Sequence, residues 1–119
     1  MGEYSCIFYE NADGKSLVEE FIESLDDQTR DKFILKQQLL QDLGPQLRYP
    51  HTDHIEEAVF ELRFKGVEGQ IRVLFFFFYG KRIIFSHGFV KKTQKTPRKE
   101  IEIAKRRRQD FLARHKREG

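Results

Sequence analysis

Three apolar segments in quick succession constrain the fold of this chain more than any other feature. They span residues 58–64, 70–79 and 82–91 and are rich in aromatic and β-branched side chains. The breaks between them, at residues 67–69 and at Gly80-Lys81, are so short that consecutive strands must run antiparallel. Glycine at the first central position is typical of a two-residue type II′ turn. The sequence therefore predicts an antiparallel sheet of three consecutive strands.

Helical patterns flank this sheet on both sides in the sequence. Ser16 followed by Glu19 forms a capping-box pattern, which predicts a helix to about residue 25. Asp26 or Asp27 can then begin a second helix that runs to about residue 43, before Gly44-Pro45. Its inner side is predicted to carry Phe33, Leu39, Leu40 and Leu43.

The remaining segments complete the predicted order. Residues 4–9 are predicted to form a short first strand, and residues 45–57 are predicted to form a loop that carries His51 and His54. Thr96 as N-cap and Pro97 at the first helical position predict a last helix to about residue 116. The order β-α-α-β-β-β-α is that of an α+β fold, and we expect one domain over residues 1–119.

The charges of this chain are unevenly distributed. The net charge is only +3, but residues 1–61 carry a balance of −9 and residues 62–119 a balance of +12. A basic half in a small protein raises the expectation of a polyanionic partner, most often a nucleic acid.

Several classes of site are not supported by the sequence. Cys6 is the only cysteine, so neither an intramolecular disulfide nor a thiolate metal site can form. His51 and His54 lack a cluster of further ligands, and the chain has no glycine-rich phosphate loop, HExxH or serine nucleophile elbow. No signal-peptide pattern and no apolar run long enough to cross a bilayer occur. We therefore expect a cytoplasmic protein without a metal or other cofactor.

The predicted hairpin registers sort the strand side chains onto two faces. They pair Arg63 with Arg72, Arg72 with Phe89, and Leu74 with His87. Because side chains alternate along a strand, one face becomes wholly apolar and should pack on the two helices. Its members are Phe60, Leu62, Phe64, Val73, Phe75, Phe77, Ile84 and Val90.

The opposite face is predicted to be polar at one end only. That end carries Glu61, Arg63, Arg72, His87, Phe89 and Lys91. At the other end, Leu74, Phe76 and Phe85 should be covered by the apolar stripe of the last helix, which is Ile101, Ala104, Phe111 and Leu112.

The polar end has two interpretations. Opposed arginines repel, and Glu61 could neutralise them on a face that is simply solvated. Alternatively, guanidinium, ammonium and imidazole groups beside an aromatic ring suit a phosphate flanked by a stacked base. The basic segment 91–99 follows directly and is either a solvated loop or the rim of this anion site. We prefer the phosphate-binding interpretation.

Four segments carry a family resemblance. They are Phe60-Glu61-Leu62-Arg63, residues 69–75, residues 87–97 and residues 100–104, and the stretch HGF-x-KKTxKTP from His87 to Pro97 is the most specific. In this order they resemble the RelE/ParE toxin superfamily of type II toxin–antitoxin systems, and within it the HigB-like, phage-derived branch. The resemblance implies a RelE-like microbial-RNase-type fold. It also implies a cognate antitoxin, typically of helix-turn-helix type, through which operator DNA would be contacted.

In the RNase branch of that superfamily, the toxin enters the ribosome and cleaves mRNA without a metal, by attack of the ribose 2′-OH on the adjacent phosphate. The resemblance places Arg72 at the scissile phosphate, Arg63 and Lys65 on the preceding strand, and Lys91 and Lys92 after the last strand. His87 is the candidate for proton transfer, because its unperturbed pKa is near neutrality. The downstream tyrosine of some members has no counterpart, so the general base stays open. We expect RNA or ribosome contacts from Lys65, Phe89, Lys92, Lys95, Arg98, Lys99 and His54.

Two other functions are also consistent with these sequence features. A ParE-like inhibitor of DNA gyrase would have the same fold but act by protein–protein contact. An RNA-binding module without catalysis needs only the basic surface. The grouping of Arg63, Arg72, His87 and Lys91 favours the nuclease, because a gyrase inhibitor does not require it.

Overall fold

The computed structural model describes residues 2–118 and confirms the predicted α+β class. A five-stranded sheet has the order β1-β5-β4-β3-β2. Only β1 and β5 run parallel, and the other neighbours are antiparallel. The strands are β1 (Ser5–Phe8), β2 (Thr52–Glu56), β3 (Val59–Gly66), β4 (Gly69–Phe78) and β5 (Arg82–Lys91).

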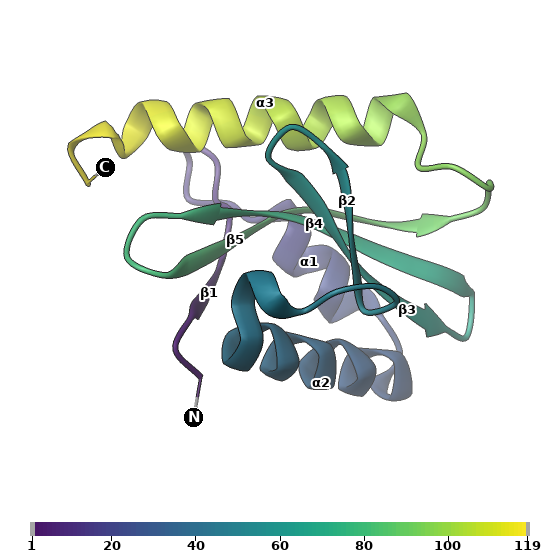
Figure 1. Ribbon diagram of the computed structural model, residues 1–119. Coiled ribbons are helices and arrows are strands. Elements are labelled where there is room, and N and C mark those ends of the chain that lie inside the picture. Colours follow the sequence, from purple (N-terminus) through teal and green to yellow (C-terminus); the bar gives the residue numbers. More distant parts are fainter. Residues whose placement is uncertain (1, 119) are drawn as a thin grey trace.

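Helices cover both faces of this sheet. Two of them, α1 and α2, pack on one face, and α3 crosses the other face (Figure 1). This arrangement is compatible with a RelE-like fold. The helices are α1 (Leu17–Ser24), α2 (Asp27–Leu43) and α3 (Arg98–Arg114), with short 3-10 turns at Gly44–Gln46 and Lys116–Glu118.

The ends of the first two helices follow the local sequence signals. Ser16 Oγ accepts a hydrogen bond from the backbone N–H of Glu19 at 3.2 Å, and Asp26 caps α2 by accepting from Thr29 at 3.1 Å. Gly44 ends α2 with a φ of 54°. A Cβ there would lie 2.4 Å from the ring of Tyr4, so both the backbone angle and the space require glycine.

The predicted cap of the last helix is wrong. Pro97 is the N-cap of α3 and no side chain caps this end, and the helix ends at Arg114 rather than near residue 116. Thr96 instead donates its hydroxyl to Glu61 Oε1 at 3.0 Å. The Thr96 side chain is thus directed toward a buried carboxylate on a distant strand, and α3 begins one residue later than predicted.

The segment predicted as a loop contains a strand. Residues 52–56 form β2, an edge strand that pairs with β3 through Thr52–Leu62, Asp53–Glu61 and His54–Phe60. Ile55 is its only large aliphatic side chain, so periodicity could not reveal it. His54 therefore lies in a strand and not in a loop.

The β4–β5 hairpin differs from its predicted form in two compensating ways. Phe78 pairs with Arg82, which leaves three residues in the turn, and both Gly80 and Lys81 have positive φ. The predicted two-residue type II′ turn is therefore wrong. A β-bulge at Ser86 then shifts the ladder by one residue, so that Leu74 pairs with His87 and Arg72 with Phe89, as predicted.

This register change places two core residues on the sheet faces opposite to those predicted. Phe85 belongs to the core between the sheet and α1/α2, whereas Ile84 packs with Phe76 and Phe111 beneath α3. Each of the two is therefore on the face opposite to the predicted one. The error is confined to the segment between the turn and the bulge.

The core under α2 is narrower than predicted. Phe33 and Leu40 are buried there, as expected, but Leu39 and Leu43 are 36% and 40% exposed. On the other face, Ile101, Ala104 and Phe111 of α3 are buried, and the Arg108 guanidinium lies over the Phe76 ring at 5.8 Å. Within residues 2–118, no helix is both long and apolar enough to cross a membrane.

Candidate functional site

A buried carboxylate organises the polar end of the sheet. Glu61 on β3 is 1% exposed. Its Oε2 accepts a hydrogen bond from Arg63 Nη1 at 2.6 Å and lies 3.6 Å from Arg72 Nε, while its Oε1 accepts from Thr96. The predicted pairing of Arg63 with Arg72 is confirmed. Glu61 thus offsets the repulsion between two opposed arginines.

Arg72 is held tightly in this cluster. Its side chain is 4% exposed, and Nη1 donates to the backbone oxygen of Ile71 at 2.9 Å. Burial lowers the pKa of Arg72, the charge of Arg63 lowers it further, and Glu61 opposes both. Within residues 2–118, the buried Nε groups of Arg63 and Arg72 have no hydrogen-bond acceptor. The cluster therefore holds more donors than its own carboxylate can satisfy.

Two neighbouring depressions share Arg63, Lys91 and Gln94, and we call them together the basic groove. One extends to Glu61, Lys95 and Thr96, and the other extends to Arg72, Lys92 and Thr93.

Lys91 occupies the shared part of the basic groove, at the end of β5. Burial lowers its pKa below the usual range, and the charges of Arg72 and Arg63 act in the same direction, whereas Glu61 opposes them. The basic groove thus contains an amine that gives up its proton more readily than an ordinary lysine.

His87 and Phe89 do not join this cluster. His87 Nε2 lies 2.7 Å from Glu100 Oε1, its Nδ1 lies 3.5 Å from Arg107, and its ring stacks on Phe89 with centroids 5.6 Å apart. Phe89 is 8% exposed and packs in the core beneath α3. The helix thus covers both side chains, and neither lines the basic groove.

We expect the His87 imidazole to titrate below pH 6.5, its ordinary value. Burial lowers its pKa, and this outweighs the hydrogen bond with Glu100, which raises it. The unfolded chain then binds more protons than the folded chain as pH falls through 6.5, so this residue makes folding less stable at acidic pH. An NMR titration of the ring protons measures the pKa. The variant Glu100→Gln should lower it further, and a midpoint above 6.5 would contradict the expectation.

The other residues predicted to contact RNA differ in their solvent exposure and in their polar partners within the protein. Lys65, Lys92, Lys95 and Lys99 are exposed, and Lys92 and Lys95 line the basic groove. Arg98 is engaged by both oxygens of Glu56 at 2.6 and 2.7 Å and also by Glu102, so carboxylates balance its charge. The ring of His54 packs on Phe60, and its Nε2 lies 2.6 Å from the Glu57 carbonyl.

Three members of this site were not singled out as site residues from the sequence, although Gln94 and Thr96 lie in the segment 91–99. The pattern Thr96-Pro97 predicted a helix cap and not a site residue. The Tyr49 ring lies 4.9 Å from the Arg63 guanidinium, and Gln94 lines both depressions. Tyr49 precedes β2 in the segment predicted as a loop, so no local pattern could place it beside Arg63. Among residues 2–118 there is no group of three or more histidine, cysteine, aspartate or glutamate side chains that could hold a metal ion.

The fold is compatible with that of RelE-like toxins. A profile of the family described as "Phage derived protein Gp49-like (DUF891)" matches residues 20–109, which is most of the chain. The chain therefore belongs to this family of RelE-like toxins from toxin–antitoxin systems, and membership implies an antitoxin partner. No curated protein sequence matches the chain.

Proposed function

We propose that this protein is an mRNA interferase, a toxin of the HigB-like branch that cleaves mRNA on the ribosome in the cytoplasm. The observation that carries the proposal is the convergence of Arg63, Arg72 and Lys91 around Glu61 at the basic groove. The proposed reaction needs no metal: the ribose 2′-OH loses its proton and attacks the adjacent phosphate, the bond to the 5′-oxygen breaks as that oxygen takes up a proton from water, and a cyclic phosphate remains.

The charges of the basic groove suit this reaction. Among the described residues, five cationic side chains that line it have no close carboxylate partner other than Glu61. The exposed Asp53 adds one negative charge at its rim, and Arg98 and Glu56, which also line it, pair with each other. The pentavalent transition state gains negative charge on its equatorial oxygens, which preorganised cationic donors stabilise. Guanidinium groups match phosphate oxygens in pairs. The five cations are Arg63, Arg72, Lys91, Lys92 and Lys95.

Lys91 is the better candidate for proton transfer in this geometry. His87 is bound to Glu100 beneath α3, outside the basic groove. Lys91 lies in the groove and has a lowered pKa, which a base working near neutral pH requires. We propose that its neutral amine accepts the 2′-OH proton, with Arg63 and Arg72 on the phosphate.

The exposed lysines extend the proposed RNA surface beyond the reacting phosphate. Lys92 and Lys95 continue the basic groove, and Lys65 and Lys99 are exposed on β3 and α3. They would contact ribosomal or messenger RNA through salt-sensitive phosphate interactions. The antitoxin is proposed to be of helix-turn-helix type, and the toxin would meet operator DNA only through it.

Induced expression without an antitoxin tests the proposal. Wild type should arrest translation and create new mRNA 5′ ends, whereas Lys91→Ala should create at least about 100-fold fewer. Arg106→Ala, which removes an exposed arginine of α3 outside the groove, is the matched control and should behave as wild type. Purified protein should cut mRNA only when ribosomes are present.

Two outcomes would overturn the proposal. DNA damage after induction, with intact mRNA, would indicate a gyrase inhibitor of the ParE type. RNA affinity that falls with salt but yields no cyclic-phosphate product would indicate a binding module without catalysis.

A further inference from the structure

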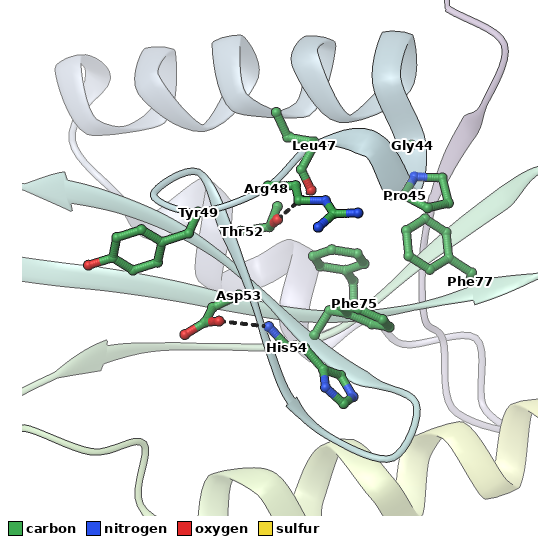
Figure 2. Close-up of a pocket in the computed structure, with 11 residues that line it drawn as sticks. Gly44, Pro45, Leu47, Arg48, Tyr49, Thr52, Asp53, His54, Phe75 and Phe77 are labelled. Carbon is green, nitrogen blue, oxygen red and sulfur yellow. Dashed lines mark hydrogen bonds between the residues drawn. The ribbon is translucent and has the colours of Figure 1, made fainter.

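An aromatic cavity lies directly beside the basic groove. It has a volume of about 500 Å³, and its floor is made by Phe60, Phe75 and Phe77. The turn after α2 forms one wall, through Gly44, Pro45 and Leu47, and the rim carries Arg48, Tyr49, Asp53 and His54 (Figure 2).

The cavity and the basic groove are continuous in their lining. Tyr49, Asp53 and His54 line both of them. Tyr49 also lies against the Arg63 guanidinium, so this one side chain connects the basic groove to the rim of the cavity. A group held in the cavity would therefore lie next to a phosphate held by Arg63.

The rim of the cavity carries one cationic side chain, Arg48, and one carboxylate, Asp53, which make few polar contacts with the rest of the protein. Within residues 2–118, the Arg48 side chain has no hydrogen-bond or ion-pair partner, although it stands above the aromatic floor in Figure 2. Asp53 accepts a hydrogen bond from the backbone N–H of His54 at 3.0 Å and forms no salt bridge within the same residues. Arg48 and Asp53 are both drawn among the side chains that line the cavity in Figure 2.

We propose that this cavity binds a guanine base of the RNA, next to the phosphate that the basic groove holds. The inference rests on the proposed function. Aromatic side chains stack on bases of any kind. Guanine adds the two hydrogen-bonding edges that the rim requires: N1–H and the N2 amino group donate to a carboxylate, and O6 and N7 accept from a guanidinium. Asp53 would bind the first edge and Arg48 the second.

The other bases fit this rim less well. Adenine and cytosine each turn one amino donor but also one ring-nitrogen acceptor toward a carboxylate, and the acceptor repels it. Uracil offers a single N–H between two carbonyl oxygens. Only guanine presents two adjacent donors to Asp53 together with paired acceptors for Arg48.

Nucleotide binding followed by ¹H–¹⁵N NMR tests this assignment on the whole chain. The probes are GMP, IMP, AMP, CMP and UMP, with inorganic phosphate for the basic groove alone. GMP should shift the amide signals of residues 52–54 and the ring protons of Phe60 and Phe77, and it should bind about tenfold more tightly than AMP, CMP or UMP. IMP, which lacks only the 2-amino group, should bind more weakly than GMP. Phosphate should shift the signals of Lys91 and Gln94 but not the ring protons of Phe60 and Phe77, which line the cavity and not the basic groove.

Single substitutions test whether GMP binding depends on the rim residues and not on exposed charges elsewhere on the surface. Asp53→Asn should abolish the preference for GMP over AMP, and Arg48→Ala should weaken GMP binding about tenfold. Asp31→Asn and Arg106→Ala make the same chemical changes at exposed positions outside the cavity and should leave binding unchanged.

The outcomes distinguish this inference from the proposed function. Shifts absent from the cavity, or equal affinities for GMP and UMP, would overturn the guanine subsite even if mRNA is cleaved. Binding of GMP that survives in Lys91→Ala while cleavage is lost would support both. Specific GMP binding without any mRNA cleavage would uphold the cavity as a guanine site and overturn the nuclease.

Discussion

Replacing Glu61 with leucine is expected to lower the free energy of unfolding by about 3–5 kcal/mol. The carboxylate is buried and pairs with Arg63 at 2.6 Å and with Arg72 at 3.6 Å. Leucine would leave the two opposed guanidinium groups without a counter-charge, and it would also remove the acceptor of the Thr96 hydroxyl. Chemical denaturation of the wild type and the variant measures the difference.

Two further variants sharpen this measurement. Glu61→Gln keeps one oxygen acceptor, for either Arg63 or Thr96, but loses the second oxygen and the charge, so its cost should be smaller than that of Glu61→Leu. Glu20→Leu makes the same change at an exposed position of α1 and should alter stability by no more than about 0.5 kcal/mol. A variant Glu61→Leu as stable as the wild type would show that the arginines do not need this carboxylate.

The change Lys91→Arg is expected to slow mRNA cleavage by about 100- to 10,000-fold while RNA binding is retained. Arginine keeps the positive charge beside Arg63 and Arg72, but it does not release a proton near neutral pH. The rate on ribosome-bound mRNA, measured together with RNA affinity, separates a proton-transfer role from a purely electrostatic one.

The pH dependence of cleavage gives a second measure of the same role. Because the neutral amine is the active form, the wild-type rate should rise with pH until it levels off below the ordinary lysine value of 10.5. Lys15→Arg, at an exposed position before α1, should leave the rate unchanged. Full activity in Lys91→Arg would contradict proton transfer by Lys91.

Some parts of the site could be predicted because they depend on neighbours in the sequence. The glycine-containing break at residues 67–69 centres the β3–β4 hairpin, and a tight hairpin determines every pair along it, including Arg63 with Arg72. Its alternation also determines that Glu61 shares their face. Ser16 and Asp26 begin the first two helices through hydrogen bonds that span only three residues.

Other parts depended on contacts between distant segments. The bulge at Ser86 restores the predicted pairs of Arg72 and Leu74 after a three-residue turn, and the Ser86 hydroxyl donates to the Leu74 carbonyl across the ladder. β2 exists because β3 offers a free edge to a segment with little strand character of its own. Neither feature leaves a periodic pattern in the chain.

The sequence by itself determined the antiparallel hairpins, the starts of the first two helices and the paired arginines, since short connections and caps act within a few residues. Only the tertiary structure decided which polar groups join the arginines. The placement of α3 covers His87 and Phe89 and leaves Lys91 in the basic groove. The path before β2 brings Tyr49 to Arg63, and the Thr96 hydroxyl donates to the buried Glu61 carboxylate instead of lying at the helix cap position. These choices follow from burial and charge balance between segments far apart in the chain.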